Sequence, residues 1–214
     1  MTRRQWTGLA GILFGALMVI GVTTSGTTPD TGTGAVERYT KYWADGGHQD
    51  RAALGSILLT YACVLLALFS AALGSLLSRT EDGGLRSVVL STGTAAAATL
   101  AAGAALLNGV GIAAAESSGY APDGSQALLV EAIGYYTAAT AMMMAGAMAV
   151  AFSLANRRAR LVPQWTTVLS GLLGLVALGS IFVAWIGFMV LPVWSVVIGV
   201  CLLVRRQSED PAPA

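Results

Sequence analysis

The stretch "SVVLSTGTAAAATLAAGAALLNGVGIAAA", residues 87–115, decides the fold class. It contains no Asp, Glu, Lys or Arg. A helix needs about 20 mainly apolar residues to cross the hydrocarbon core of a bilayer. The stretch is therefore longer than one crossing requires, and it predicts a transmembrane helix.

The composition of the whole chain favours the same class. Of the 214 residues, 55% are hydrophobic and only 11% are charged, whereas a soluble domain carries about 25% charged residues. The formal net charge is +1, which argues against nucleic acid as a partner. The lipid bilayer is the expected partner.

Further apolar stretches predict an all-α, polytopic membrane protein with six transmembrane helices in one bundle. The run 164–204 is too long for one helix, so we expect two short spans with a tight turn near Ala184–Gly187. The predicted domain covers residues 1–206, and a disordered cytoplasmic tail covers 207–214. The predicted spans are 7–24, 52–77, 87–115, 127–155, 164–183 and 187–204.

The basic residues predict the orientation. With both termini inside (N-in/C-in), the inner loops and ends hold nine basic residues and the outer loops hold three. This asymmetry follows the positive-inside rule and predicts a multi-pass protein of the plasma (cytoplasmic) membrane with both termini cytoplasmic. The inner residues are Arg3, Arg4, Arg79, Arg86, Arg157, Arg158, Arg160, Arg205 and Arg206, and the outer ones are Arg38, Lys41 and Arg51.

Tryptophans at the boundaries agree with this orientation. Trp6 and Trp165 are expected at the inner boundary, and Trp185 and Trp194 near the outer one, as interfacial anchors. The first span is expected to stay uncleaved, because no Ala-x-Ala-like site follows it.

Small residues recur at every fourth position of span 87–115. The row consists of Gly93, Ala97, Ala101, Ala105, Gly109 and Ala113. We expect it to form one smooth helix face for close packing of a neighbouring helix, with a homodimer seam as the alternative. Gly11 and Gly15 form a shorter version on the first span.

Three spans are longer than a membrane crossing requires and are expected to extend outward. Their extensions bring polar residues to one level and predict an outward-facing polar vestibule. The candidate ligand-binding residues are His48, Asp50, Arg51, Asn108, Glu116 and Glu131. The alternative is a solvated collar of helix caps and salt bridges.

The outer loop 25–51 is expected to roof this vestibule. Within it, residues 34–44 predict a short amphipathic helix, since Val36, Tyr39 and Trp43 share a face from which Glu37 and Lys41 point away. Such a helix is suited to lying on the outer membrane surface.

Glu131 lies inside the apolar stretch 127–155, and ionisable residues inside spans are functional candidates. Counting about 20 residues outward from Asn156 puts the hydrocarbon edge near Tyr136. Glu131 would then lie about 7 Å beyond that edge. We therefore expect an interfacial carboxylate that pairs with a cation such as Arg51, while Glu116 is another candidate partner for Arg51.

Several phrases of the chain resemble a known group. They are "TPD" (28–30), "VERYTKYW" (36–43), "RLVPQWTTVLSGLLGL" (160–175) and "LPVWSVVIGVCLLVRR" (191–206). On these phrases and its layout, the whole chain resembles a broad group of uncharacterised six-helix integral membrane proteins from high-GC bacteria. The resemblance implies a six-helix fold in the cytoplasmic membrane and implies no activity.

Three classes of function remain open at this stage. The first is a non-enzymatic accessory, sensing or ligand-binding protein that takes a lipid or small apolar ligand. The second is a small transporter that uses Glu131 as a proton or cation site. The third is a membrane enzyme acting on a lipid or isoprenoid, with Glu131 as general acid beside Tyr135 and Tyr136. We expect no cofactor and no metal.

Overall fold

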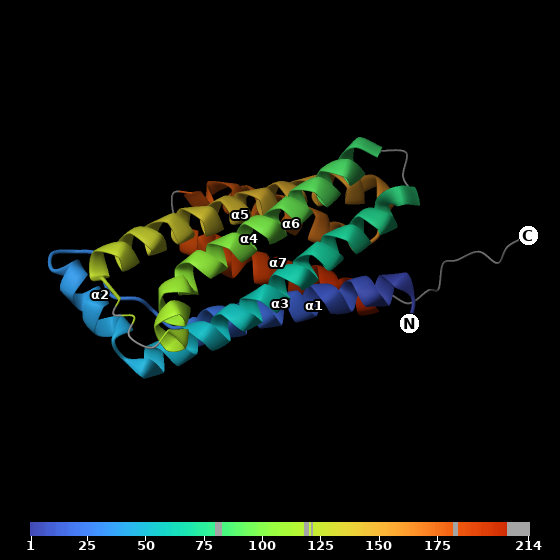
Figure 1. The fold of residues 1–214 in the computed structure, drawn as a ribbon. Helices are drawn as coiled ribbons and strands as arrows, with labels where there is room; N and C mark the ends of the chain where they lie inside the picture. Colours follow the sequence, from blue (N-terminus) through green and yellow to red (C-terminus); the bar gives the residue numbers. More distant parts are fainter. Residues whose placement is uncertain (80–82, 118–119, 121, 182–183, 205–214) are drawn as a thin grey trace, which may run out of the picture.

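The computed structural model describes residues 1–79, 83–117, 120, 122–181 and 184–204, and Figure 1 shows them as a bundle of long helices. The described chain is all-helical, as predicted. The predicted tail 207–214 and the side chain of Trp185 lie outside the described residues. The helices are α1 (Arg3–Ser25), α2 (Ala35–Trp43), α3 (Gly46–Leu76), α4 (Gly83–Glu116), α5 (Gly124–Ala159), α6 (Gln164–Leu178) and α7 (Ala184–Val204), with short 3₁₀ turns η1 (Leu77–Arg79) and η2 (Gly179–Ile181).

The long helices α1, α3, α4 and α5 run antiparallel to the next one in the chain, and α7 packs back against α1. Gly8, near the start of α1, lies against Gly199, near the end of α7, and a Cβ atom on Gly8 would lie 2.6 Å from the Gly199 carbonyl oxygen. Gly21, near the end of α1, lies against Leu59 in the first half of α3. The start of α1 and the end of α7 therefore lie at the same end of the bundle (Figure 1).

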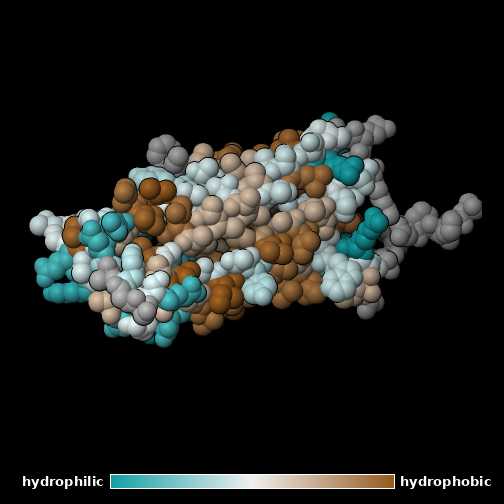
Figure 2. All heavy atoms as spheres, in the orientation of Figure 1, coloured by the Kyte–Doolittle hydropathy of each residue, from teal (hydrophilic) through white to brown (hydrophobic). Residues whose placement is uncertain are grey.

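Charge separates the two ends of the bundle. One end, here called the arginine end, holds the start of α1, the start of α4 and the end of α5, with Arg3, Arg4, Arg86, Arg157, Arg158 and Arg160. The other, here called the roofed end, is covered by α2 (Figure 1). Hydrophilic residues gather at both ends in Figure 2, and apolar ones cover much of the face between them.

In the described part of the chain, five helices are long and apolar enough to cross a membrane: α1, α3, α4, α5 and residues Ile186–Val204 of α7. The apolar helix α6 has only 15 residues. The turn expected at Ala184–Gly187 lies earlier in the chain, because Gly179–Ile181 forms η2 and Ala184 begins α7. Gly187 is needed inside α7 for packing, since a Cβ atom there would lie 2.7 Å from the Cβ of Met142.

The predicted excess length of three helices is confirmed. α3, α4 and α5 have 31, 34 and 36 residues. At about 1.5 Å per residue they are about 46 to 54 Å long, against about 30 Å of hydrocarbon. Aspartates cap the N-termini of α3 and α5. The Asp45 side chain accepts a hydrogen bond from the Gly47 N–H at 2.7 Å, and the Asp123 side chain accepts one from the Ser125 N–H at 2.9 Å. Such caps satisfy amides that the first helical turn leaves free.

The small residues of α4 do not form the single face that was predicted. Gly93 is tightly packed, with Ser70 and Met148 within 3 Å of where its Cβ would be, but Ala105 is exposed and nothing lies within 4 Å of a Cβ on Gly109. Four residues turn a helix through more than 360°, because one turn takes 3.6 residues. The row therefore spirals away from the contact, and Gly103 and Gly111 take over the close packing.

Trp194 is a core residue and not the interfacial anchor that was expected. It is 1% exposed and lies between Phe69 and Phe152, with ring centroids 5.8 and 6.1 Å away. Its Nε1–H donates to the Ser170 hydroxyl at 2.9 Å. Trp6 and Trp165, by contrast, are each 59% exposed near the arginine end.

The amphipathic helix exists as α2, but its apolar face packs on the protein and not on the membrane surface. Tyr39 and Trp43 are 1% and 3% exposed, and α2 contacts α3, α4 and α5. Val36 is the exception, since it is 49% exposed. The expectation that this loop roofs the ends of the extended helices is met (Figure 1).

Candidate functional site

A cavity of about 360 Å³ lies under the roof, between α1, α3, α4, α5 and α7. We call it the roof cavity. Its apolar walls include Leu59, Leu100, Ala104, Leu107, Ala138 and Phe188. Its polar lining includes Thr28, Trp43, Asn108, Glu131 and Tyr135. A pocket of this size with apolar walls and a few polar groups is typical of small-molecule sites.

The roof cavity reaches deep into the bundle. On α4 it extends from Asn108 to Leu100 and on α5 from Glu131 to Ala138. At about 1.5 Å per residue these steps are about 12 and 10 Å. The polar lining is therefore at the roofed end, and the apolar lining runs toward the middle of the helices.

Glu131 is half-buried on α5 and is held from the loop that follows α1. Its Oε1 accepts a hydrogen bond from the Thr28 hydroxyl at 2.5 Å. Its Oε2 is buried and has no hydrogen-bond partner in the described part of the chain. A buried acceptor without a partner costs about 1–3 kcal/mol, and more where it is charged.

Tyr39 of α2 also interacts with Glu131. The pKa of the Tyr39 hydroxyl is raised to about 12, first by burial and further by the negative charge of the Glu131 carboxyl, while its hydrogen bond with Thr28 acts in the opposite direction. The hydroxyl therefore keeps its proton at neutral pH and remains a donor. Thr28 and Tyr39 together supply neutral donors to Glu131 and bring no positive charge.

The predicted ion pair of Arg51 with Glu131 or Glu116 is not formed in the described part of the chain. Arg51 and Glu116 are exposed at the surface. The salt bridge that forms at this end joins Lys41 and Glu37, one turn apart on α2, at 2.7 Å. It lowers the pKa of the exposed Glu37 carboxyl. No salt bridge to Glu131 is formed by the residues that the structure describes.

Trp43 is the second residue of the roof cavity with an unpaired polar atom. It is 3% exposed, and no described residue accepts a hydrogen bond from its Nε1–H. Its ring is fixed from two sides: Tyr42 packs edge-on at 4.9 Å between centroids, and a Cβ on Gly111 would lie 2.5 Å from the ring. Two residues of the cavity lining therefore carry an unpaired polar atom: Glu131 carries an acceptor and Trp43 carries a donor.

Asn108 is a buried member of the polar lining and is 4% exposed. Its amide nitrogen donates to the Ala104 carbonyl oxygen at 3.0 Å. This bond fixes the side chain along α4.

The structure brings some of the predicted site residues together and leaves others apart. Asn108, Glu131 and Tyr135 line the roof cavity. His48 stacks on Tyr42 with ring centroids 3.9 Å apart, and its Nδ1 lies 3.1 Å from the Tyr42 carbonyl oxygen. The residues that were predicted for the vestibule or the catalytic site and do not line the roof cavity are His48, Asp50, Arg51, Glu116 and Tyr136.

Tyr136 lines a second hollow of about 400 Å³ beside the roof cavity. Thr28, Glu131 and Tyr135 belong to the linings of both. Pro29, Asp30 and Tyr39 complete its roofed side. The Glu131 carboxyl therefore lies where an inner cavity and an outer hollow meet.

Two residues of this site, Thr28 and Trp43, were absent from the sequence-based candidates. Trp43 carried a usable signal, because the amphipathic pattern already placed it with Tyr39 on the apolar face of the loop helix. Thr28 carried none, since a threonine in a turn gives no indication of a carboxyl partner 103 positions away.

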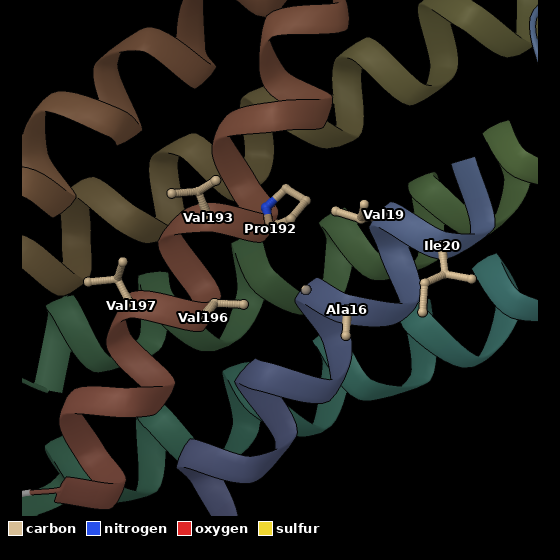
Figure 3. A pocket seen from close by; sticks show the side chains of 8 residues that line it. Ala16, Val19, Ile20, Pro192, Val193, Val196 and Val197 are labelled. Carbon is tan, nitrogen blue, oxygen red and sulfur yellow. The ribbon is translucent and has the colours of Figure 1, made fainter. Parts of the chain in front are cut away.

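Figure 3 shows another hollow, a groove of about 440 Å³ between α1 and α7. Ala16, Val19, Ile20, Pro192, Val193 and Val196 line it, with Gly15 and Val197. No polar side chain lines this groove, so nothing in it would select one apolar molecule over another.

Comparisons of the chain with models of protein families, with curated proteins and with solved structures find no match.

Proposed function

We propose that this chain is a six-helix protein of the plasma membrane that binds a small amphiphilic molecule in its roof cavity. The observation that carries the proposal is the pair of unpaired polar atoms, Glu131 Oε2 and Trp43 Nε1, on residues that line the same cavity. Buried polar groups are normally paired, so exceptions need an explanation. A ligand that enters the cavity and bonds to both atoms supplies one.

The shape of the lining supports an amphiphile. The polar groups are at the roofed end, and Leu59, Leu100 and Phe188 provide apolar walls below them. A polar head would lie beside Glu131 and Trp43, and an apolar chain would extend toward the middle of the bundle. Burial of that chain would provide most of the binding free energy, at about 25 cal/mol per Å² of apolar surface.

The proposed orientation puts both termini in the cytoplasm and the roof cavity in the outer leaflet. Its support is the gathering of arginines at the end where α1 begins, as the positive-inside rule requires. The short α6, continued by η2, is the proposed sixth crossing.

The orientation is tested by cysteine labelling in a cysteine-free background. Gly46 and Gly84 are exposed, and an added Cβ atom at either would contact nothing within 4 Å. Gly46→Cys should react with an impermeant maleimide from outside intact cells, and Gly84→Cys only after lysis. Labelling of both from the same side would contradict the proposed orientation.

Transport through Glu131 and acid catalysis on a lipid or isoprenoid remain alternatives. Transport requires a path to the arginine end, whereas the deepest lining residues of the roof cavity, such as Leu100 and Ala138, lie near the middle of their helices. Catalysis requires a substrate whose reacting atom meets the Glu131 carboxyl. Both alternatives begin with binding in the same cavity, so binding is the property to measure first.

The binding proposal is tested with radiolabelled decanol and decylamine on protein in lipid nanodiscs, after subtraction of empty nanodiscs. Ala104→Phe should abolish saturable binding, because Ala104 is 3% exposed and the new ring would fill the roof cavity. Ala16→Phe is the matched control, since Ala16 lines the separate α1–α7 groove (Figure 3). Absence of saturable binding for both probes, or equal binding by wild type and Ala104→Phe, would overturn the proposal.

A further inference from the structure

The polar lining of the roof cavity constrains the head group of the ligand, and this inference rests on the binding function proposed above. We infer that the head is that of an amino alcohol: a protonated amine that donates to Glu131 Oε2, next to a neutral oxygen that accepts from Trp43 Nε1–H. The apolar chain of the same molecule would lie along the lower walls of the roof cavity.

The amine is inferred from charge. Glu131 Oε1 accepts from the neutral Thr28 hydroxyl, the neutral Tyr39 hydroxyl also interacts with the carboxyl group, and Oε2 has no hydrogen-bond partner among the described residues. The lining of the roof cavity includes no Lys, Arg or His. Buried charges in proteins are paired, so the partner that this carboxylate lacks is a cation with an N–H to donate.

The aromatic residues of the lining support the same charge. Trp43, Tyr135 and Phe188 all line the roof cavity. A cation near an aromatic face is attracted by the ring quadrupole, and most strongly by Trp. A carboxylate head would meet Glu131 with like charge and would gain nothing from these rings.

The oxygen is inferred from Trp43. Its indole N–H can only donate, and an ammonium group can only donate as well. An amine alone would therefore leave Trp43 Nε1 unpaired, whereas an alcohol oxygen beside the amine would pair it. Glu131 Oε2 would pair with a cationic donor, and Trp43 Nε1–H would pair with a neutral acceptor. An amino alcohol combines these two groups.

The test compares four probes that share a decyl chain and differ in the head: an amino alcohol, an amine, an alcohol and a carboxylate. Saturable binding to wild-type protein in nanodiscs should decrease in that order at neutral pH. A bond between charged partners is expected to favour the amine over the alcohol by about tenfold to a hundredfold. The carboxylate should bind most weakly of the four.

Two variants test separately which residue recognises the amine and which recognises the oxygen of the head group. Glu131→Gln should reduce the preference for the amine over the alcohol by at least about tenfold, and Glu116→Gln is the matched control because Glu116 is an exposed carboxylate on α4. Trp43→Phe keeps an aromatic ring and should remove the preference for the amino alcohol over the amine. Melting temperatures of the variants show whether each is folded.

The outcomes separate this inference from the function on which it rests. If the alcohol or the carboxylate binds as tightly as the amines and Ala104→Phe blocks it, the cavity binds amphiphiles and the amino-alcohol inference is wrong. If the amine preference survives Glu131→Gln, the inference is also wrong. If no probe shows saturable binding, the proposed function itself fails.

Discussion

The half of the bundle next to the roofed end, here called the roofed half, differs from the packed half next to the arginine end. Each half contains a buried tryptophan, and the two differ in the hydrogen bonding of the indole N–H. Trp194 and Trp43 are 1% and 3% exposed. In the packed half, Trp194 Nε1 donates to Ser170, and Asn156 nearby bonds to Thr167 at 2.6 Å and to the backbone of Val162. In the roofed half, Trp43 Nε1 has no hydrogen-bond partner among the described residues, and Trp43 belongs to the lining of the roof cavity. The same fold thus pairs one buried indole and leaves the other unpaired, and this difference supports the proposed binding site.

The largest expected difference comes from removing the two rings. Trp194→Ala would empty a site enclosed by Phe69 and Phe152, and core truncations of this size cost about 3–5 kcal/mol. Trp43→Ala should cost less, since its ring already borders the roof cavity. Chemical unfolding in mixed micelles measures both. A larger loss for Trp43 would mean that the roof, and not the lower core, holds the bundle together.

Adding volume should give the same ranking of the two halves, for the opposite reason: the packed half has no room for the added atoms. Ala149 and Ala104 are each 3% exposed, but Ala149 lines a void of only about 10 Å³ while Ala104 lines the cavity of about 360 Å³. Ala149→Leu should overpack and cost about 1–3 kcal/mol. Ala104→Leu should cost little or stabilise the fold, and equal losses in unfolding experiments would mean that the cavity has no room.

The roofed half should also respond to alkaline pH. The Tyr39 pKa is about 12 in the folded protein against an ordinary value near 10, so the folded state favours the protonated hydroxyl. This contribution is complete below pH about 10 and is lost as the pH rises toward 12. Tyr39→Phe should remove that part of the alkaline destabilisation in melting experiments. Tyr61→Phe, a change at a residue that is 62% exposed, should leave it in place.

The smallest stability effect is expected at Glu131. Glu131→Gln keeps a carbonyl oxygen for the Thr28 hydroxyl and removes a carboxyl that has no cationic partner. The free energy of unfolding should fall by at most about 1 kcal/mol, because the change also removes a buried group without a partner. A loss of several kcal/mol would show that Glu131 is a structural residue of the roof, and the case for a ligand would weaken.

Much of the fold and part of the candidate site could be predicted from the sequence. Apolar runs predict the long helices, and their excess length puts Asn108 and Glu131 near one level, where both line the roof cavity. These inferences follow from counting residues along regular helices of known rise. The early turn at Gly179 was missed because the run from 164 to 204 contains no polar break, so only packing, such as that of Gly187 on Met142, decides its position.

The rest of the site depends on contacts between distant segments. The amphipathic pattern correctly predicts that Tyr39 and Trp43 share an apolar face, but whether that face covers protein or lipid depends on where the loop folds back. Pairing of Arg51 with Glu131 was inferred only from their similar positions along the long axis of the bundle. The position of a residue along a helix does not specify the direction in which its side chain points around the helix axis. Arg51 is exposed, whereas Glu131 lines the roof cavity.

The most direct test of the binding site compares the two tryptophans in one experiment. Protein in nanodiscs with ¹⁵N-labelled tryptophan gives indole N–H signals, and Trp43→Phe and Trp194→Phe assign the two that matter. We expect the decyl amino alcohol to shift the Trp43 signal as its N–H gains an acceptor, while the Trp194 signal stays in place because its N–H already donates to Ser170. Saturable binding with an unmoved Trp43 signal, or equal shifts of both signals, would contradict this expectation.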